Sequence, residues 1–162
     1  MNGLFGRCVV KSVSGLISLG LLAGNCYAAT IVVQPNTVIS QPTRFSGDTL
    51  DMSRGSFIIK NGATLTIDGC TINGTLSPRN PVLFNVDTGN LVFTNNIGNI
   101  KAVNLQPHPM TQSLQYVIQV ALGSVDLEKN RFSIDQGFEA GFLMTTSSIA
   151  TTGFKITENR FE

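Results

Sequence analysis

The chain has little charge, and it has no tryptophan. Charged residues make up 13% of its 162 residues, whereas about a quarter of an ordinary domain is charged. The formal net charge is +1, and the basic residues form no run. The sequence therefore offers no electrostatic field that would attract nucleic acid or an anionic membrane surface, and we expect no nucleic-acid partner.

Long apolar runs are missing after the first 28 residues. No later stretch reaches the roughly 18 apolar residues of a membrane-spanning helix, so no span is expected. Residues 1–28 have the pattern of a secretory signal peptide, because Arg7 and Lys11 precede an apolar core over 13–24 and a Cys-Tyr-Ala sequence supplies a small-x-small cleavage site. We expect cleavage after Ala28 and a secreted, periplasmic or cell-surface protein.

Cysteine is scarce. Cys8 and Cys26 lie in the expected signal peptide, which leaves Cys70 without an internal disulfide partner. Cys26 raises an alternative, because Leu-Ala-Gly-Asn-Cys is close to a bacterial lipoprotein site. Asn25 stands where that site takes a small residue, so we favour the unlipidated form. We interpret Cys70 as a small buried apolar side chain.

What the chain does contain is a repeated eight-residue motif. Residues 154–161 copy residues 125–132 in the pattern apolar, x, apolar, x, x, Asn, x, Phe. Residues 65–72 fit the same frame with Cys70 in place of the asparagine. Residues 91–96 fit its first six positions, after which the motif slips by one or two residues. Repeats of this length indicate stacked structural units.

The repeats predict strands. A second apolar alternation precedes each copy, and period-two alternation indicates strands with one buried face. The copies start at residues 65, 91, 125 and 154, so that successive units are 26, 34 and 29 residues apart. Three short strands in units of uneven length predict an all-β fold, a right-handed parallel β-helix of about four to five coils over 49–162. Residues 29–48 contain no copy and are expected as an N-terminal cap of lead-in strands.

The repeated polar position has a structural interpretation. Stacked coils place Asn96, Asn130 and Asn159 about 4.8 Å apart. There each asparagine can adopt the left-handed conformation of a bend, and its amide can hydrogen-bond to the next in a ladder. Cys70 occupies the same position in its unit. We therefore predict a structural ladder at these four positions, with the phenylalanines two residues later stacked in the core.

The Asn-Arg-Phe copies at 130–132 and 159–161, with the Leu-x-Ile-x-Gly-Cys-x-Ile copy at 65–72, resemble the repeats of pectate-lyase-like right-handed parallel β-helices. The resemblance covers about residues 50–162. It implies the fold but no single activity, because the superfamily includes polysaccharide lyases and hydrolases, adhesin and autotransporter passengers, and phage tail proteins. The chain ends one residue after a complete motif, as expected of an N-terminal fragment or of an open coil that self-associates.

A lyase of this superfamily would need clustered acids for calcium and an arginine or lysine base, and a hydrolase would need two close carboxylates. No Asp-Asp, Asp-x-Asp or Glu-x-Asp pair occurs on an expected strand, and the hydrolase signatures (Asn-Thr-Asp, Asp-Asp, Gly-His-Gly) and the lyase signature Arg-x-Pro-x-x-Arg are absent. We expect no catalytic residue, metal or cofactor; calcium enters only under an enzyme alternative. His108, the only histidine, lies in a proline-containing loop over 103–114, which is a candidate contact because long excursions often carry binding.

Two further pairs lie beside the ladder. Arg131 and Arg160 occupy the outward position after the asparagine and form either a basic stripe for acidic sugars or solvated surface charge. Lys129 and Glu158, one position before it, are expected to form an exposed ion pair. The sequence favours a secreted, non-enzymatic β-helix that acts as a surface, adhesion or carbohydrate-contact scaffold. The alternative is the remnant of a polysaccharide lyase or glycoside hydrolase whose catalytic coils are missing.

Overall fold

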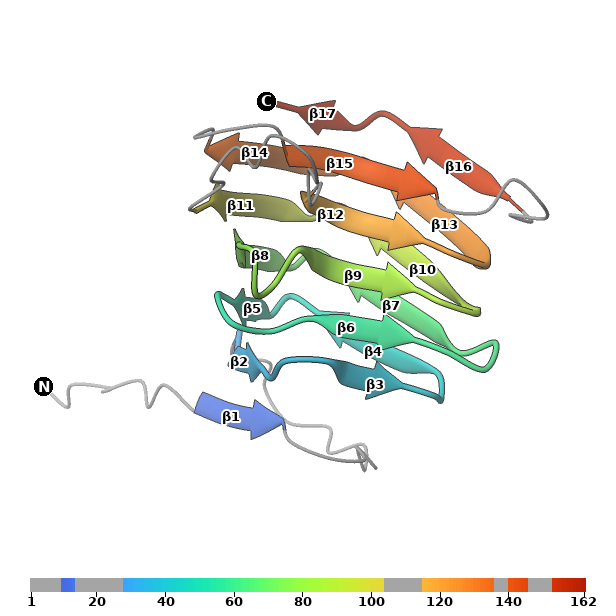
Figure 1. Cartoon of the computed structure of the whole chain (residues 1–162), viewed down its shortest axis with the longest axis horizontal. Helices are drawn as coiled ribbons and strands as arrows, with labels where there is room; N and C mark the ends of the chain where they lie inside the picture. Colours follow the sequence, from blue (N-terminus) through green and yellow to red (C-terminus); the bar gives the residue numbers. More distant parts are fainter. Residues whose placement is uncertain (1–9, 14–27, 104–114, 136–139, 146–152) are drawn as a thin grey trace, which may run out of the picture.

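The computed structural model describes residues 10–13, 28–103, 115–135, 140–145 and 153–162 (Figure 1). Every element in this part of the chain is a β-strand. The described residues therefore contain no helix of the length and apolarity needed to cross a membrane. The strands form three sheets, which we call A, B and C.

Each sheet is a stack of parallel strands. Sheet A has the order β1 (Val10–Val13), β2 (Thr30–Val33), β5 (Thr49–Met52), β8 (Thr71–Leu76), β11 (Ile97–Ala102), β14 (Arg131–Asp135) and β17 (Arg160–Phe161). Sheet B has the order β3 (Thr37–Ile39), β6 (Phe57–Ile59), β9 (Val82–Val86), β12 (Gln115–Val120) and β15 (Ala140–Thr145). Sheet C has the order β4 (Thr43–Ser46), β7 (Thr64–Asp68), β10 (Gly89–Thr94), β13 (Gly123–Glu128) and β16 (Phe154–Thr157).

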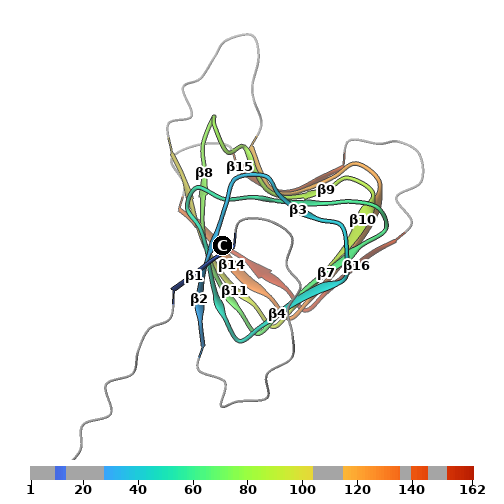
Figure 2. The same cartoon turned by 90° about the horizontal axis from the view of Figure 1, so that it is seen from below.

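The chain visits the sheets in turn. From β2 onward it runs from sheet A through sheet B to sheet C and then returns to sheet A. Seen along the stack, the three sheets form the sides of one coil that repeats (Figure 2). This confirms the all-β chain with three parallel strands per unit, and the stack is compatible with a parallel β-helix.

Residues 29–48, in which no copy of the motif occurs, provide a strand to each sheet. Strands β2, β3 and β4 pair in register with β5, β6 and β7. Phe45 of β4, for example, is the register partner of Ile67 of β7. On its other edge β2 pairs with β1, which lies within residues 1–28.

Phenylalanine rings run through the core from coil to coil. Centroids are 5.8 Å apart for Phe45 and Phe57, 5.8 Å for Phe57 and Phe84, and 4.8 Å for Phe84 and Phe93. The next contact, from Phe93 to Phe132, is 6.1 Å. Full burial of one such ring stabilises the fold by about 1.5–3 kcal/mol, so the column contributes to the stability of the stack.

The expected slip of the motif after Asn96 is wrong. Strand β11 stays in register with both neighbours, so that Gly98 lies opposite Ile72 on one side and Phe132 on the other. Ile97 points outward and is 53% exposed, whereas Ile100 is buried. The inward position holds a glycine because the ring of Phe132 occupies the space in front of it.

Candidate contact face

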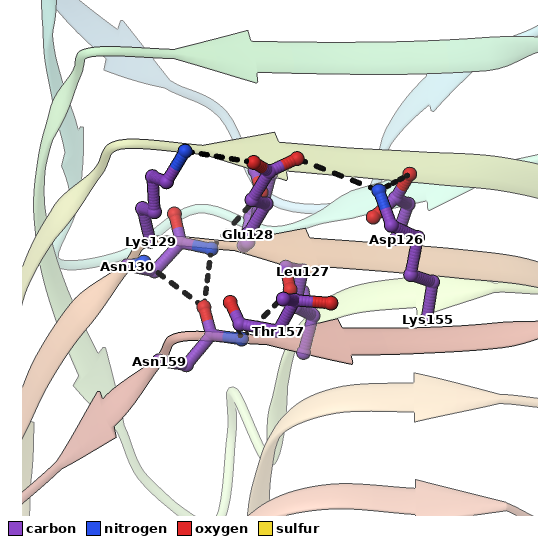
Figure 3. A network of polar contacts seen from close by, with 9 residues as sticks. Asp126, Leu127, Glu128, Lys129, Asn130, Lys155, Thr157 and Asn159 are labelled. Atoms are coloured by element: carbon purple, nitrogen blue, oxygen red, sulfur yellow. Dashed lines mark hydrogen bonds and ion pairs between the residues drawn. The ribbon is translucent and has the colours of Figure 1, made fainter.

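The corner between sheets C and A holds the repeated asparagines. The backbone N–H of Cys70 donates to Asn96 Oδ1 at 2.8 Å, that of Asn96 to Asn130 Oδ1 at 3.0 Å, and that of Asn130 to Asn159 Oδ1 at 2.9 Å. The side-chain Nδ2 atoms of Asn96 and Asn130 donate to the same oxygens, at 2.9 Å and 2.8 Å. The amides therefore form a continuous hydrogen-bonded row from coil to coil, of which Figure 3 shows the rung between Asn130 and Asn159.

Each Nδ2 also donates a hydrogen bond to a backbone carbonyl oxygen of the preceding coil. Asn96 donates to Ile67 O at 2.8 Å, Asn130 to Phe93 O at 2.9 Å, and Asn159 to Leu127 O at 2.7 Å. Asn96 and Asn130 are almost fully buried. An unpaired buried polar group costs about 1–3 kcal/mol, so these bonds satisfy groups that would otherwise destabilise the corner. The row is therefore a structural element of the corner.

The bend itself lies one residue earlier than expected. Positive φ angles occur at Gly69 (61°), Asn95 (57°), Lys129 (54°) and Glu158 (53°), each directly before a ladder position. The expectation that the ladder asparagines adopt the left-handed conformation is wrong. The preceding residue bends the chain from sheet C into sheet A, and the next side chain reaches both adjacent coils with its amide.

Cys70 fills the ladder position without extending the row. It is 1% exposed, and its Sγ donates to Asp68 O at 3.5 Å. Burial raises the pKa of the Cys70 thiol above its ordinary value. The side chain is therefore a neutral thiol at neutral pH, and low thiolate content makes it a poor nucleophile.

Beyond the ladder, the outer face of sheet A carries one row with both predicted contact arginines. Thr71, Ile97, Arg131 and Arg160 follow one another in register across β8, β11, β14 and β17. Arg131 Nη2 lies 3.4 Å from Glu162 Oε2, and Arg160 pairs with Oε1 of the same carboxylate. The two guanidinium groups therefore form an exposed pair that shares a single carboxylate.

A second polar row, which is uncharged from β8 onward, runs beside the arginine row. Asp51, Asn73, Asn99 and Ser133 are register partners across β5, β8, β11 and β14. Asn99 Nδ2 donates to Asn73 Oδ1 at 3.2 Å. Asn73, Asn99 and Ser133 are exposed. We call the outward side chains of the two rows, from β8 to β17, the sheet A face.

Sheet C carries a compact group of charges near the same corner (Figure 3). Lys155 Nζ lies 3.4 Å from Glu128 Oε2 and 3.7 Å from Asp126 Oδ2, and Lys129 Nζ lies 3.0 Å from Glu128 Oε1. The expected ion pair between Lys129 and Glu158 is replaced by the pair with Glu128, because the side chain of Lys129 extends toward the end of β13. Glu158 acts on Lys129 only at longer range.

Asp126 and Glu128 form an acidic pair in the order Asp-x-Glu on the outer face of β13. The prediction from the sequence covered only the orders Asp-Asp, Asp-x-Asp and Glu-x-Asp and so missed this pair. The ammonium of Lys129, with Lys155 second, holds the pKa of Glu128 below its ordinary value. A general acid for glycoside cleavage needs a raised pKa, so Glu128 does not have the property of one.

Within the described ranges, no three His, Cys, Asp or Glu side chains are grouped so as to hold a metal ion. His108 and nearly all of the loop over 103–114 lie outside the described residues. Comparison with protein-family models, curated proteins and solved structures finds no match to this chain. The sheet A face is thus the candidate site that rests on described side chains.

Proposed function

We propose that the chain is a secreted, non-enzymatic, right-handed parallel β-helix of the pectate-lyase-like kind that acts as a carbohydrate-contact scaffold at a cell surface. In this proposal residues 1–28 are a signal peptide that is removed after Ala28. The observation that carries the proposal is the sheet A face, where neutral hydrogen-bonding side chains and two arginines lie in register on adjacent strands.

The chemistry of this face suits a sugar chain. Asn73, Asn99 and Ser133 can both donate hydrogen bonds to hydroxyl groups and accept them. The exposed Ile97 side chain offers an apolar contact for the C–H face of a sugar ring. Because the side chains are fixed on a sheet, less conformational entropy is lost on binding than with a flexible loop.

The paired arginines add recognition of acidic groups. A planar guanidinium forms two parallel hydrogen bonds with a carboxylate. Glu162 already contacts both Arg131 and Arg160, so an acidic sugar would displace its carboxylate from an exposed ion pair. Such pairs contribute only about 0–1 kcal/mol, which makes the exchange energetically accessible.

A glycan-binding measurement with the secreted protein tests this proposal. Arrays of neutral and uronate-containing polysaccharides would be probed with wild type and with the Arg131→Gln, Arg160→Gln double variant, which we expect to bind about tenfold or more weakly to acidic chains. Arg44→Gln is the matched control, because Arg44 is also an exposed, ion-paired arginine but lies on sheet C.

Two results would contradict the proposal. One is a loss of binding in Arg44→Gln as large as that in the double variant, because this would indicate a general charge effect. The other is release of reducing or unsaturated sugar ends by the wild-type protein, with or without calcium, which would favour the lyase or hydrolase alternative.

A further inference from the structure

Asp48 occupies the ladder position of the first described corner. Thr49, which follows Asp48, is the register partner of Thr71, which follows Cys70. Thr71 N donates to Asp48 O at 2.9 Å. Asp48 thus precedes Cys70 in the ladder row. Its side-chain Oδ1 accepts a hydrogen bond from the backbone N of Ala29 at 3.2 Å.

This first rung differs from the later ones in its acceptor. At Cys70, Asn96 and Asn130 the backbone N–H donates to a neutral asparagine oxygen of the next coil, at 2.8–3.0 Å. At Ala29 the same type of donor faces a carboxylate. A neutral amide oxygen is sufficient for a peptide N–H, whereas a carboxylate would interact more strongly with a donor that carries a positive charge.

We propose that Asp48 binds the α-ammonium group that forms at Ala29 when the signal peptide is removed. This inference rests on cleavage after Ala28 and is independent of the carbohydrate function. On hydrolysis, the carbonyl carbon of Ala28 exchanges its bond to nitrogen for a bond to the water oxygen and leaves as the carboxylate of the leader. The released nitrogen of Ala29 takes up protons and is mainly an ammonium at pH 7, because its ordinary pKa is about 7.7–8.0.

The surroundings leave Asp48 available for this role. The nearest cationic side chain on the preceding strand, Arg44, is bound to Asp68 at 2.6 Å. Cys70, which packs beside Asp48, carries a neutral thiol. Among the described residues no lysine or arginine forms an ion pair with Asp48. The ammonium of Ala29 would supply the missing counter-charge from a position already within hydrogen-bonding distance.

Cleavage of the signal peptide would in this way stabilise the start of the first coil. Thr49 N donates to Ala29 O at 2.8 Å, so both backbone groups of Ala29 are held by residues 48 and 49. Removal of residues 1–28 takes away β1, which covers the edge of β2. The ion pair formed by the same cleavage holds the start of the first coil after that neighbour has gone.

Four forms of the secreted protein test the proposal. Intact mass and N-terminal sequencing must first show that the mature chain starts at Ala29. The Tm of wild type and of Asp48→Asn would then be measured twice, once with the α-amine free and once with it selectively acetylated. We expect acetylation to lower the Tm of wild type by about 2–5 °C and to leave that of Asp48→Asn nearly unchanged, which is a double-mutant cycle for the pair.

A second measurement covers the case in which Asp48→Asn does not fold. The pH dependence of α-amine acylation in wild type should give a pKa above the ordinary range, because the carboxylate stabilises the ammonium. Asp51→Asn is the control, since Asp51 accepts from Ser53 N at 3.0 Å on the same sheet. A mature chain that starts at another residue, an ordinary α-amine pKa, or equal Tm losses in both backgrounds would overturn the proposal.

Discussion

The ring of Phe132 lies directly over Gly98, its register partner on the neighbouring strand of sheet A. A Cβ atom at Gly98 would overlap Cδ1 and Cε1 of this ring. The ring is held in place by Phe93 on one side and by Phe142, whose centroid is 4.8 Å away, on the other. The inward position of β11 therefore has no side chain, and the ring of Phe132 from the next coil fills the space.

Gly98→Ala should destabilise the fold by about 1–3 kcal/mol, because the added methyl group forces Phe132 out of a packed position. Urea unfolding followed by circular dichroism would measure the change. In the Phe132→Leu background the same substitution should cost clearly less, since the overlapping ring is gone. Additive effects of the two substitutions would show that the contact is not the cause.

The alternation of apolar residues was sufficient to predict most strands, because inward residues such as Leu65 and Ile67 must be buried for the coils to stack. It failed at Gly98 because this inward position has no apolar side chain of its own. The ring of a neighbouring strand fills the space, and the alternation of apolar residues cannot show this. The slip inferred after Asn96 followed from this. The pairing of β11 with β8 and β14 reveals the true register.

The bend position was hidden for another reason. Gly69, Asn95, Lys129 and Glu158 share a left-handed backbone but no chemical property, so the repeat did not mark them. The asparagines were visible because hydrogen bonding requires their side chain at every rung. Sequence patterns thus reveal positions where the side chain is essential and conceal positions where only the backbone matters.

Glu158→Gly should stabilise the protein by about 0.5–1 kcal/mol, because glycine adopts φ of 53° without the steric cost that a side chain carries. The reciprocal change, Gly69→Ala, should destabilise by about 1–2 kcal/mol. A Cβ at Gly69 meets no atom within 4 Å, so any loss comes from the backbone alone. Denaturant midpoints at constant slope would measure both, and an unchanged midpoint in Gly69→Ala would contradict this account.

Cys70→Asn should extend the ladder by one rung and stabilise the fold by about 0.5–1.5 kcal/mol. Asn96 accepts from the N–H of Cys70 and donates to Ile67 O; by analogy, the new amide would accept from the N–H of Asp48 and donate to the O of Phe45, the register partner of Ile67. Thermal unfolding would measure the gain. Cys70→Ser is the control, because its short hydroxyl group cannot reach both coils; an equal gain in that variant would rule out the ladder as the cause.

The charge group on sheet C predicts an ordered set of pKa changes at Glu128. Lys129 is the larger cause of its lowered pKa and Lys155 the smaller one, so the carboxyl pKa should rise more in Lys129→Met than in Lys155→Met. NMR titration of the Glu128 side chain would measure both. Because the folded-state pKa lies below the unfolded value, the associated stability is present above the unfolded pKa and is lost as pH falls through the folded one. Both shifts should shrink at high salt, since the group is exposed; a larger effect of Lys155→Met would contradict the arrangement in Figure 3.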